Sequence, residues 1–525
     1  MNREFETLLA RLDRDGHAPL LAGGLKGLEK ESLRISETGR IAQTPHPAAL
    51  GSALTHPHIT TDYSEALPEL ITPPFADPTD TLRFLEELHG FVYRHLDGEL
   101  LLASSMPCGI DGDASIPIAE YGASNIGRMK HVYRQGLAWR YGRSMQSIAG
   151  IHFNYSVPDA LWPVLQELRE DSRPPAEFMA DAWFGLIRNI LRHGWLVLYL
   201  FGASPALCKS FFKNREHLAA GFSEFDGETF FKPWATSLRM SDIGYRNDNQ
   251  SGLDVSFNSL AEYAAALCRA IATPSEQYRR IGVKVGSEYR QLNVNILQIE
   301  NEYYNSVRPK QIARSGEKPT LALKKRGIRY VELRSIDLNP FQPCGIDVPG
   351  LRVLETFLLW CLFQPSPPMP REEKEKTDRN LLSVATEGRK PGLTLIQGDN
   401  AIPLRIQAEE ILQGLAGLAG LLDAGRDEQP YRRALETHRA AVADPELTPS
   451  ARVLAEMHDS AQRFAEFALE HSHRHARQFR STALSLARQR AFTREAEDSH
   501  TRQRRIEAED RLSFEEFLHH YFSQK

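Results

Sequence analysis

Polar and apolar residues alternate in a short segment near the start of the chain, residues 27–34, which reads Gly-Leu-Glu-Lys-Glu-Ser-Leu-Arg. Since successive side chains of a strand point to opposite faces, this pattern predicts a strand with Glu29 and Glu31 on one face. Two neighbouring carboxylates repel one another unless they are solvated, paired or bridged by a cation. The segment is therefore interpreted either as the solvated face of an antiparallel sheet or as a site for a hard divalent cation such as Mg²⁺.

Two later segments, residues 150–157 and 330–335, alternate in the same way. The first carries His152 on its polar face, and the second carries Glu332 and Arg334 on the face opposite two aliphatic residues. Each segment predicts a strand that presents ionic or ligand-forming groups. Such faces are also typical of sheets that have water on one side.

Longer stretches repeat apolar positions at helical spacing, among them residues 175–200 and 258–272. We expect both to be packing helices rather than sites. The leucines of residues 412–422 predict a further helix, and Ser513 with Glu516 forms a capping box at the start of the last one.

The order of strands and helices lacks the regular alternation of a doubly wound parallel sheet, which favours an α+β fold. Residues 364–370, Gln-Pro-Ser-Pro-Pro-Met-Pro, break the pattern, and the charged residues 371–379 follow directly. Neither segment can form a packed core, so residues 364–380 are predicted to be a linker or surface loop. It separates an α+β part, residues 1–363, from a mainly helical C-terminal region, residues 381–525, packed on that part.

The composition fits a soluble enzyme: the 525 residues are 42% hydrophobic and 25% charged, enough for a large core. The formal net charge of −5 provides no attraction to nucleic acid or to an anionic membrane, so neither partner is expected. The N-terminal segment lacks the apolar stretch of a signal peptide, and the five cysteines are scattered singly. Both features indicate a cytoplasmic protein with reduced thiols.

Nucleotide-binding loops of the common kinds are absent from the sequence. A Gly-Lys dipeptide occurs nowhere, which excludes a Walker A loop, and residues 23–27 lack the spacing of a dinucleotide-binding fingerprint. The pooled metal-ligand candidates are instead Glu29, Glu31, Asp62, Glu69, His152 and Glu332, enough for two or three Mg²⁺ ions. Arg239 and Arg334 can neutralise carboxylate or phosphate. Together these groups favour phosphoryl transfer from ATP, which requires positioning and charge neutralisation rather than a protein nucleophile.

A series of short motifs resembles, in the same order, the proteobacterial type (type 1) of glutamate-cysteine ligase, also called gamma-glutamylcysteine synthetase. The motifs are residues 27–31, 52–56, 60–62, 105–107, 121–125, 150–154, 200–205, 308–310 and 331–335. The similarity extends over nearly the whole chain and weakens after about Gly425.

The resemblance implies the fold of the glutamine synthetase and guanido kinase group, in which a curved, mainly antiparallel sheet forms a funnel with helices packed outside. It also implies a reaction in which ATP phosphorylates the side-chain carboxylate of L-glutamate. The amine of L-cysteine then attacks the γ-glutamyl phosphate, giving γ-glutamylcysteine in the first step of glutathione synthesis. Feedback inhibition by glutathione and a monomeric state are expected as well.

The resemblance also implies roles for single residues. The Mg²⁺ ligands, with Mn²⁺ as a substitute, are expected to be Glu29, Glu31, Asp62, Glu69, His152 and Glu332. Glu332 and Arg334 are the expected catalytic residues, since Arg334 resembles the arginine that stabilises the transferring phosphoryl group. Arg239 resembles the contact to the α-carboxylate of glutamate, and Tyr133, Tyr245 and Tyr304 resemble the lining of the cysteine pocket.

Residues 387–392, Glu-Gly-Arg-Lys-Pro-Gly, also resemble a family motif, in which Arg389 and Lys390 would contact ATP phosphates. A solvated turn explains the same residues equally well. One departure concerns a regulatory cysteine pair of some family members, because no cysteine follows Cys361 here. Redox control through that bond is therefore not expected.

Two other functions remain open at this point. A related carboxylate-amine ligase with a different acceptor amine would keep the metal ligands and change the tyrosine pocket. A non-catalytic scaffold would tolerate loss of the carboxylates, and their presence argues against it.

Overall fold

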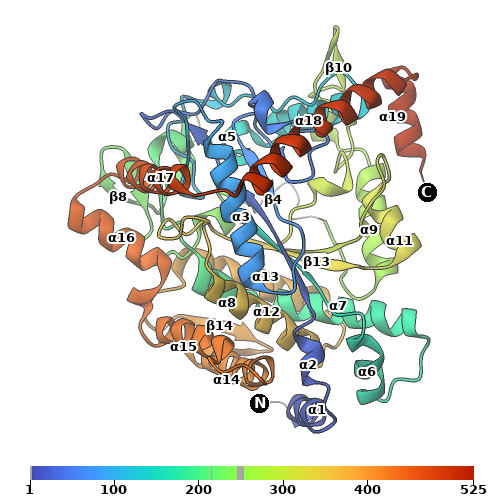
Figure 1. The fold of residues 1–525 in the computed structure, drawn as a ribbon, viewed down its shortest axis with the longest axis vertical. Coiled ribbons are helices and arrows are strands. Elements are labelled where there is room, and N and C mark those ends of the chain that lie inside the picture. Colours follow the sequence, from blue (N-terminus) through green and yellow to red (C-terminus); the bar gives the residue numbers. More distant parts are fainter. Residues whose placement is uncertain (1–2, 214–215, 245–252, 525) are drawn as a thin grey trace.

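Residues 3–213, 216–244 and 253–524 are described by the structure, a computed structural model (Figure 1). The central element is a six-stranded sheet with the order β12-β13-β6-β1-β4-β3, in which every neighbouring pair is antiparallel. Its strands are β1 (Leu25–Glu31), β3 (Ile59–Thr61), β4 (Pro68–Ile71), β6 (Ile151–Ser156), β12 (Val307–Lys310) and β13 (Tyr330–Ile336). The predicted strands within residues 27–34, 150–157 and 330–335 are thus confirmed, together with the antiparallel sheet.

Helices cover the apolar face of this sheet. Helix α3 (Pro78–Tyr93) packs against β1 and β4, α7 (Pro175–His193) against β12, and α8 (Trp195–Phe201) against β13. Helix α12 (Val348–Phe363) packs against α3 and α7. The residues Leu28, Phe153 and Leu333, which alternate with the polar positions, are fully buried in the main hydrophobic core. The alternating pattern therefore leaves the other face of the sheet to the ionic side chains.

The N-terminal two thirds of the described chain contain further short elements. The helices are α1 (Arg3–Arg14), α2 (Ala18–Leu21), α4 (Asn125–Tyr141), α5 (Arg143–Gln146), α6 (Leu161–Leu168), α9 (Leu260–Ala272), α10 (Glu276–Arg279) and α11 (Pro319–Arg326). The additional strands are β2 (Arg34–Ile35), β5 (Leu100–Leu101), β7 (Ala206–Cys208), β8 (Ser223–Asp226), β9 (Thr229–Phe231), β10 (Lys284–Val285) and β11 (Glu288–Tyr289). The stretch 175–200 is divided between α7 and α8 at Gly194 rather than forming one helix.

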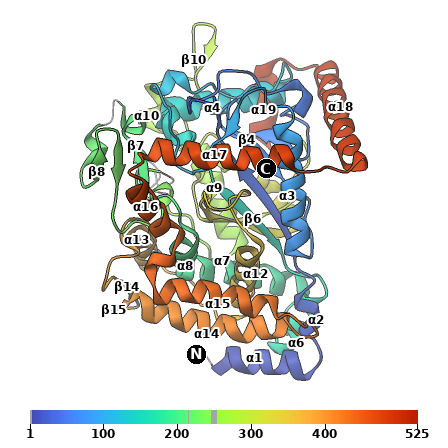
Figure 2. The ribbon, with the colours of Figure 1, turned by 60° about the vertical axis from the view of Figure 1, so that its left-hand side comes forward.

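The C-terminal region is mainly helical. Its elements are α13 (Arg371–Glu387), β14 (Thr394–Gln397), β15 (Asn400–Pro403), α14 (Leu404–Leu422), α15 (Pro430–Ala443), α16 (Pro449–Ser460), α17 (Phe464–Ser481), α18 (Leu486–Glu509) and α19 (Phe514–Ser523). Helices α14 and α15 pack on each other and on α12, and α17 crosses α3 (Figure 2). One core cluster includes Leu354 of α12 and Leu415 of α14, so this region shares the core of the sheet part. The boundaries of the predicted units, 1–363 and 381–525, stay a prediction.

The prediction that residues 371–380 belong to a loop or linker was wrong. Residues 365–370 have no regular structure, but the charged run forms the first half of helix α13. Ion pairs of 2.9–3.0 Å between residues one helical turn apart connect Arg371 with Glu375, Lys374 with Asp378 and Lys376 with Glu372. Such pairs, with the buried Val384 and Ala385 further along, stabilise a helix that has little apolar surface at its start.

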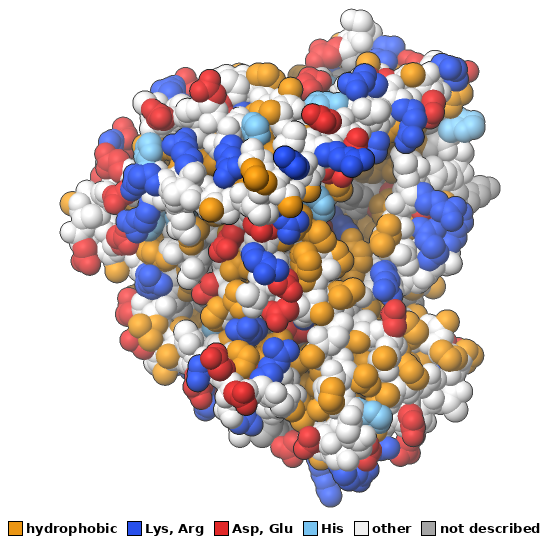
Figure 3. Space-filling model, in the orientation of Figure 1, with side chains coloured by type: hydrophobic (Ala, Val, Ile, Leu, Met, Phe, Trp, Pro, Cys, Tyr) orange, Lys and Arg blue, Asp and Glu red, His pale blue; other side chains and the backbone are white. Residues whose placement is uncertain are grey.

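Acidic and basic side chains are mixed over the face seen in Figure 3, and the surface is hollowed to the right of its centre. All five cysteines are free thiols. Among the described residues, no helix combines the length and the hydrophobicity that are needed to span a bilayer.

Candidate active site

Strand register brings the predicted ionic residues together on one face of the sheet. Glu29 of β1 lies opposite His152 of β6, and Glu31 lies opposite Glu69 of β4. On the other side of β6, Glu332 of β13 lies opposite Asn154. Because directly opposed residues point to the same face, four adjacent strands contribute side chains to one cluster.

His152 lies at the centre of this cluster. Its Nδ1 atom is 3.1 Å from Glu29 Oε2 and 3.8 Å from Glu332 Oε1, and its Nε2 atom is 3.6 Å from Glu31 Oε1. Asn154 Nδ2 donates a hydrogen bond of 2.8 Å to Glu29 Oε1. The ligand atoms of two sets, Glu29-His152-Glu332 and Glu31-Glu69-His152, each lie within 4.8 Å of one another.

Two cations hold Glu332 in place. Lys310 Nζ of β12 lies 2.9 Å from Glu332 Oε1, and Arg334 Nη1 lies 2.9 Å from Glu332 Oε2. Burial of Glu332 opposes its ionisation, but the charges of Lys310 and Arg334 outweigh burial and hold the pKa of this carboxyl well below its ordinary value. Glu332 is therefore ionised and oriented before any ligand arrives.

The other glutamates differ from one another in their electrostatics. Burial raises the pKa of Glu31, and burial together with the charges of Glu29 and Asp62 raises the pKa of Glu69 well above its ordinary value. Burial acts on Glu29 too, but the hydrogen bond to His152 and the charge of Lys310 lower its pKa to about 2. When ionised, the carboxylates at the Glu31 and Glu69 end of the cluster are thus less well compensated by the protein than those of Glu29 and Glu332.

This donor set fits a hard divalent cation. Oxygen atoms of carboxylates, the ligands that Mg²⁺ prefers, outnumber the single imidazole, which is shared by both sets. The uncompensated charge at Glu31 and Glu69 is of the kind that a bound cation would relieve. The residues present are therefore compatible with the expected metal.

A cleft opens beside the cluster. It is lined by Glu31, Asp62 and Arg334, and by Tyr133 of α4 and Tyr304. Its cavity volume is about 80 Å³, whereas a single water needs about 10–15 Å³. Asp62, which belongs to neither of the two ligand sets above, is part of the cleft lining.

Of the three tyrosines predicted for this pocket, the structure describes Tyr133 and Tyr304. The Tyr304 hydroxyl and the Gln146 side chain exchange hydrogen bonds of 2.8 and 3.0 Å, which fixes Tyr304 at the cleft wall. Tyr245 lies outside the described residues, although its neighbour Gly244 lines the cleft.

Among the residues that the structure describes, the cleft lining does not include Arg239. Its side chain is fully buried, Nη2 donates to the carbonyl of Arg334 at 2.9 Å, and Nη1 is 3.8 Å from Asp337 Oδ1. A Cβ atom on Gly150 would lie 2.1 Å from Arg239 Nη2, so only glycine leaves room for the guanidinium there. In this arrangement Arg239 supports the backbone of Arg334, and its contact with glutamate stays a prediction.

Arg389 and Lys390 have protein partners of their own. Arg389 is 5% exposed and donates to the carbonyl of Pro233 at 2.6 Å. Lys390 Nζ lies 3.0 Å from Glu387 on the surface. Within the described chain, the lining of the cleft includes neither residue. Their nucleotide-binding role stays a prediction.

Several groups that the structure adds to the site were not predicted from the sequence. Lys310 lies in a motif that the resemblance included, but its pairing with Glu332 depends on the neighbouring strand. Arg134 and Arg308, which line the cleft, and the buried Asp337 were not singled out either. For Lys310 a signal exists: Arg308 and Lys310 alternate around Pro309, which is the pattern of a strand with a charged face.

An antiparallel sheet that gathers carboxylates on one face, with a lysine and arginines beside a cleft, is typical of enzymes that transfer phosphoryl groups with the help of metal ions. Comparisons with known proteins narrow this class. The sequence model of the family described as glutamate-cysteine ligase matches residues 9–384. The chain therefore belongs to the glutamate-cysteine ligase family.

Individual relatives agree with this assignment. The chain is 48% identical to the glutamate-cysteine ligases of Pseudomonas entomophila and Azotobacter vinelandii, covering 99% of this chain and 97% and 98% of theirs. A crystal structure of a Francisella tularensis glutamate-cysteine ligase in complex with AMP superposes with a TM-score of 0.89 and 35% identity, over 95% of this chain and 97% of that one. The predicted α+β fold is confirmed by this match.

A larger protein shares the fold as well. A bifunctional glutathione synthetase from Pasteurella multocida superposes with a TM-score of 0.70 and 26% identity, over 90% of this chain and 55% of that one. The sheet and its helices therefore also occur as one part of a longer chain.

Proposed function

We propose that this protein catalyses the ATP-dependent ligation of L-glutamate, through its γ-carboxylate, to the amine of L-cysteine. The products are γ-glutamylcysteine, ADP and phosphate, the first step of glutathione biosynthesis. The observation that carries this proposal is the cluster of Glu29, Glu31, His152 and Glu332 flanked by Lys310 and Arg334, in a chain that belongs to the glutamate-cysteine ligase family.

In the first step a γ-carboxylate oxygen of glutamate attacks the γ-phosphorus of ATP, and the bond to the bridging oxygen of ADP breaks. In the second step the amine of cysteine attacks the acyl carbon of γ-glutamyl phosphate, gives up a proton, and phosphate leaves. Both steps accumulate negative charge on phosphoryl oxygens. Arg334 lies at the cleft wall with its orientation set by Glu332, so it is placed to neutralise that charge.

Two or three Mg²⁺ ions, or Mn²⁺ in their place, would be held by Glu29, Glu31, Asp62, Glu69, His152 and Glu332. Bound there, the metal neutralises and orients phosphate oxygens. Lys310 compensates Glu332 from the adjacent strand, which keeps this carboxylate fixed whether or not a cation is present.

The acceptor pocket is proposed to lie at Tyr133, Tyr245 and Tyr304. Tyr133 and Tyr304 line the cleft next to Arg334, which supports this placement for a small amine that has to reach the acyl carbon. The α-carboxylate of glutamate is proposed to depend on Arg239, and ATP phosphates on Arg389 and Lys390. Inhibition by glutathione, a monomeric state and a cytoplasmic location are further proposals.

The decisive experiment measures ADP release with ATP, Mg²⁺, glutamate and a panel of acceptor amines, together with the mass of the product. Turnover with cysteine and a product of the mass of γ-glutamylcysteine are expected. Turnover with another amine in preference to cysteine would instead indicate a related carboxylate-amine ligase.

A test variant and a control variant show whether the activity depends on the carboxylate cluster. Glu332→Gln is expected to lower kcat by several orders of magnitude, because the metal ligand and the partner of Arg334 are lost together. Arg494→Gln, a change at an 84% exposed side chain of α18, is the control and should keep full activity. Near-normal kcat in Glu332→Gln at saturating Mg²⁺ would remove Glu332 from the proposed site.

A further inference from the structure

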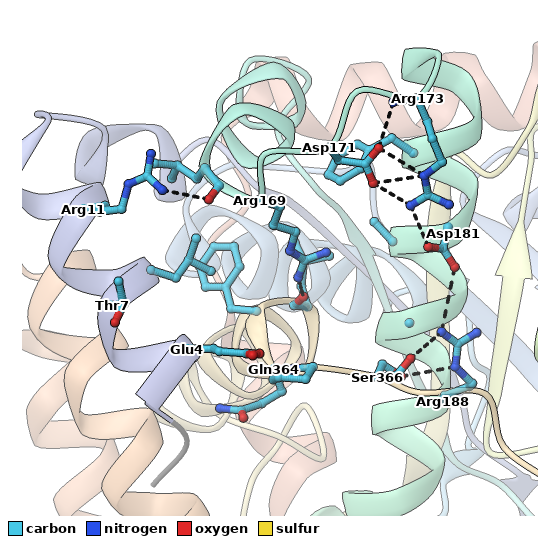
Figure 4. A pocket seen from close by; sticks show the side chains of 18 of the residues that line it. Glu4, Thr7, Arg11, Arg169, Asp171, Arg173, Asp181, Arg188, Gln364 and Ser366 are labelled. Atoms are coloured by element: carbon cyan, nitrogen blue, oxygen red, sulfur yellow. Dashed lines mark hydrogen bonds and ion pairs between the residues drawn. The ribbon is translucent and has the colours of Figure 1, made fainter.

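A second cavity, of about 910 Å³, lies between helix α1, the end of α6, helix α7 and the chain that follows α12 (Figure 4). Its lining shares no residue with that of the active-site cleft. The volume falls within the range of about 300–1,000 Å³ that is typical of small-molecule sites. The mechanism proposed above makes no use of it.

The charge of this lining is opposite in sign to that of the protein. Five arginines line the cavity against three carboxylates, whereas the whole chain has a net charge of −5. Two of the carboxylates are already engaged: Arg173 pairs with Asp171 and Asp181, at 2.6 and 3.0 Å, and Arg188 approaches Asp181 at 3.9 Å. Arg11 has a further ion pair of 3.8 Å with Glu170, whose side chain is exposed, so the uncompensated positive charge of the lining belongs mainly to Arg3 and Arg169.

Arg169 has side-chain N–H donors that find no acceptor among the described residues. Within the part of the chain that the structure describes, its side chain forms one hydrogen bond, from Nη2 to the carbonyl of Leu362 at 2.6 Å, and no ion pair. A guanidinium carries five N–H donors. The close view shows this guanidinium directed into the cavity, while Arg11 reaches from α1 toward the end of α6 (Figure 4). Arg11 donates to the carbonyl of Leu168 at 2.9 Å.

One wall of the cavity is rigid. It is formed by the start of the Pro-rich segment, residues 364–366, and hydrogen bonds from side chains of α7 hold this segment in place. Arg188 donates to the carbonyl of Ser366 at 2.8 Å, and Asn189 donates to the carbonyl of Cys361 at 2.9 Å. A wall fixed in this way forms a binding site before the ligand arrives, which reduces the ordering that binding requires.

The lining also has an apolar part, which includes Leu8, Phe178, Phe363 and Pro365. Phe178 and Leu8 come from helices that converge at the cavity, α7 and α1. We propose that this cavity binds a small anion in which a carboxylate or phosphate group, held by Arg169 and Arg11, is joined to an apolar body that packs on these side chains. The site is separate from the ligase cleft.

The test uses 1-anilinonaphthalene-8-sulfonate, a fluorescent probe that joins an anionic group to an aromatic body. Saturable binding to the full-length protein is expected, weakened about tenfold in Arg169→Gln and in Arg11→Gln, since hydrogen bonds to charged groups contribute on that order. Arg494→Gln is the matched surface control, and Arg334→Gln tests for binding in the ligase cleft. Neither of these two should change the affinity.

Competition then identifies the anionic group. Phenyl phosphate and benzoate should displace the probe, their relative affinities separating phosphate from carboxylate, whereas neutral benzyl alcohol should not. Ligase turnover should be unchanged in Arg169→Gln. Absence of saturable binding, equal affinity in Arg169→Gln and wild type, loss of binding in Arg334→Gln, or displacement by benzyl alcohol would each overturn the proposal.

Discussion

Glu69 and Glu332 lie on the same face of the sheet but in opposite electrostatic environments. Burial and the charges of Glu29 and Asp62 raise the pKa of Glu69, whereas Lys310 and Arg334 lower that of Glu332 against the effect of burial. A raised carboxyl pKa means that the folded protein loses stability as the pH rises from the ordinary value through the raised one. A lowered pKa adds stability above the ordinary value, which is lost as the pH falls through the lowered one.

Opposite effects on stability are therefore expected for two chemically identical substitutions. In metal-free protein at pH 8, with a chelator present, Glu69→Gln should raise Tm because it removes an uncompensated charge. Glu332→Gln should lower the free energy of unfolding by about 3 kcal/mol, because it leaves Lys310 and Arg334 without their shared carboxylate. Thermal unfolding followed by circular dichroism measures both. Shifts of the same sign would contradict this description of the cluster.

Arg334 should not be replaceable by lysine. Its guanidinium contacts Glu332 at 2.9 Å and still borders the cleft, a geometry that the single point charge of lysine does not reproduce. We expect Arg334→Lys to lower kcat by at least about 100-fold, as removal of a group that stabilises transition-state charge does. Arg329→Lys, at an exposed ion pair with Asp159, is the matched control. A rise confined to the KM for glutamate would assign Arg334 to substrate binding instead.

At the scale of the elements, the alternation of polar and apolar residues was sufficient to predict β1, β6 and β13, because successive side chains of a half-buried strand point in turn to the core and to the other face. It was not sufficient to predict their neighbours. Whether Lys310 pairs with Glu332 or with solvent depends on which strand lies beside β13, and that contact spans 22 positions. Arg239 illustrates the same limit, since its contacts with Asp337 and the Arg334 carbonyl are set by the packing of distant segments.

The start of helix α13 was not predicted from the sequence, for a different reason. A run of charges without an apolar stripe was interpreted as a loop, but its charges have alternating signs at a spacing of four residues. That spacing favours an exposed helix. The apolar pattern alone therefore underestimated helix content in this region.

The start of β6 provides a test at this scale. Gly150 leaves space for the Arg239 guanidinium, and its backbone N–H donates to Glu31 Oε2 at 2.8 Å. We expect Gly150→Ala to destabilise the protein by about 1–3 kcal/mol through overpacking, and to lower kcat because Arg239 and the Arg334 backbone shift together. Urea unfolding and steady-state kinetics measure these effects.

The control for this change is Gly90→Ala in α3, where an added Cβ would meet Thr482 at an ordinary 3.4 Å. Helix propensity predicts a neutral or slightly stabilising effect there. Equal stability and activity of Gly150→Ala and Gly90→Ala would show that Arg239 does not require the space at Gly150.

At the scale of the whole molecule, the last helix supports a wall of the cleft. Helix α19 packs on α4, the helix that carries Tyr133. Phe514 joins Met129 and Val132 in a separate apolar cluster, and Arg128 lies over the Phe514 ring at 4.4 Å. The part of the chain in which the family resemblance is weakest therefore positions a residue of the proposed acceptor pocket.

The variant Phe514→Ala tests whether the packing of α19 on α4 positions Tyr133. Loss of the ring removes the packing between α19 and α4, so we expect a lower Tm and a larger increase in the KM for cysteine than in the KM for ATP. Phe522→Ala, at a partly buried ring near the end of the same helix, is the control and should have a smaller effect. A change in the KM for ATP alone would contradict the proposed link between α19 and the cysteine pocket.

The reaction proposed for the whole molecule can be tested with an amino acid sulfoximine whose amino acid half mimics glutamate. With ATP and Mg²⁺ but no cysteine, the sulfoximine nitrogen should be phosphorylated and the product held tightly, because it resembles the tetrahedral species formed when the amine attacks the acyl phosphate. Inhibition should therefore develop slowly and require ATP.

Glu332→Gln provides the internal control for this inhibition. The variant should not show the slow phase, because the contacts that favour the phosphorylated species depend on the orientation of Arg334 and on the metal ligands. Rapid, ATP-independent and purely competitive inhibition of the wild-type protein would exclude a γ-glutamyl phosphate intermediate. In that case Arg334 and the carboxylate cluster would need a role other than charge neutralisation during phosphoryl transfer.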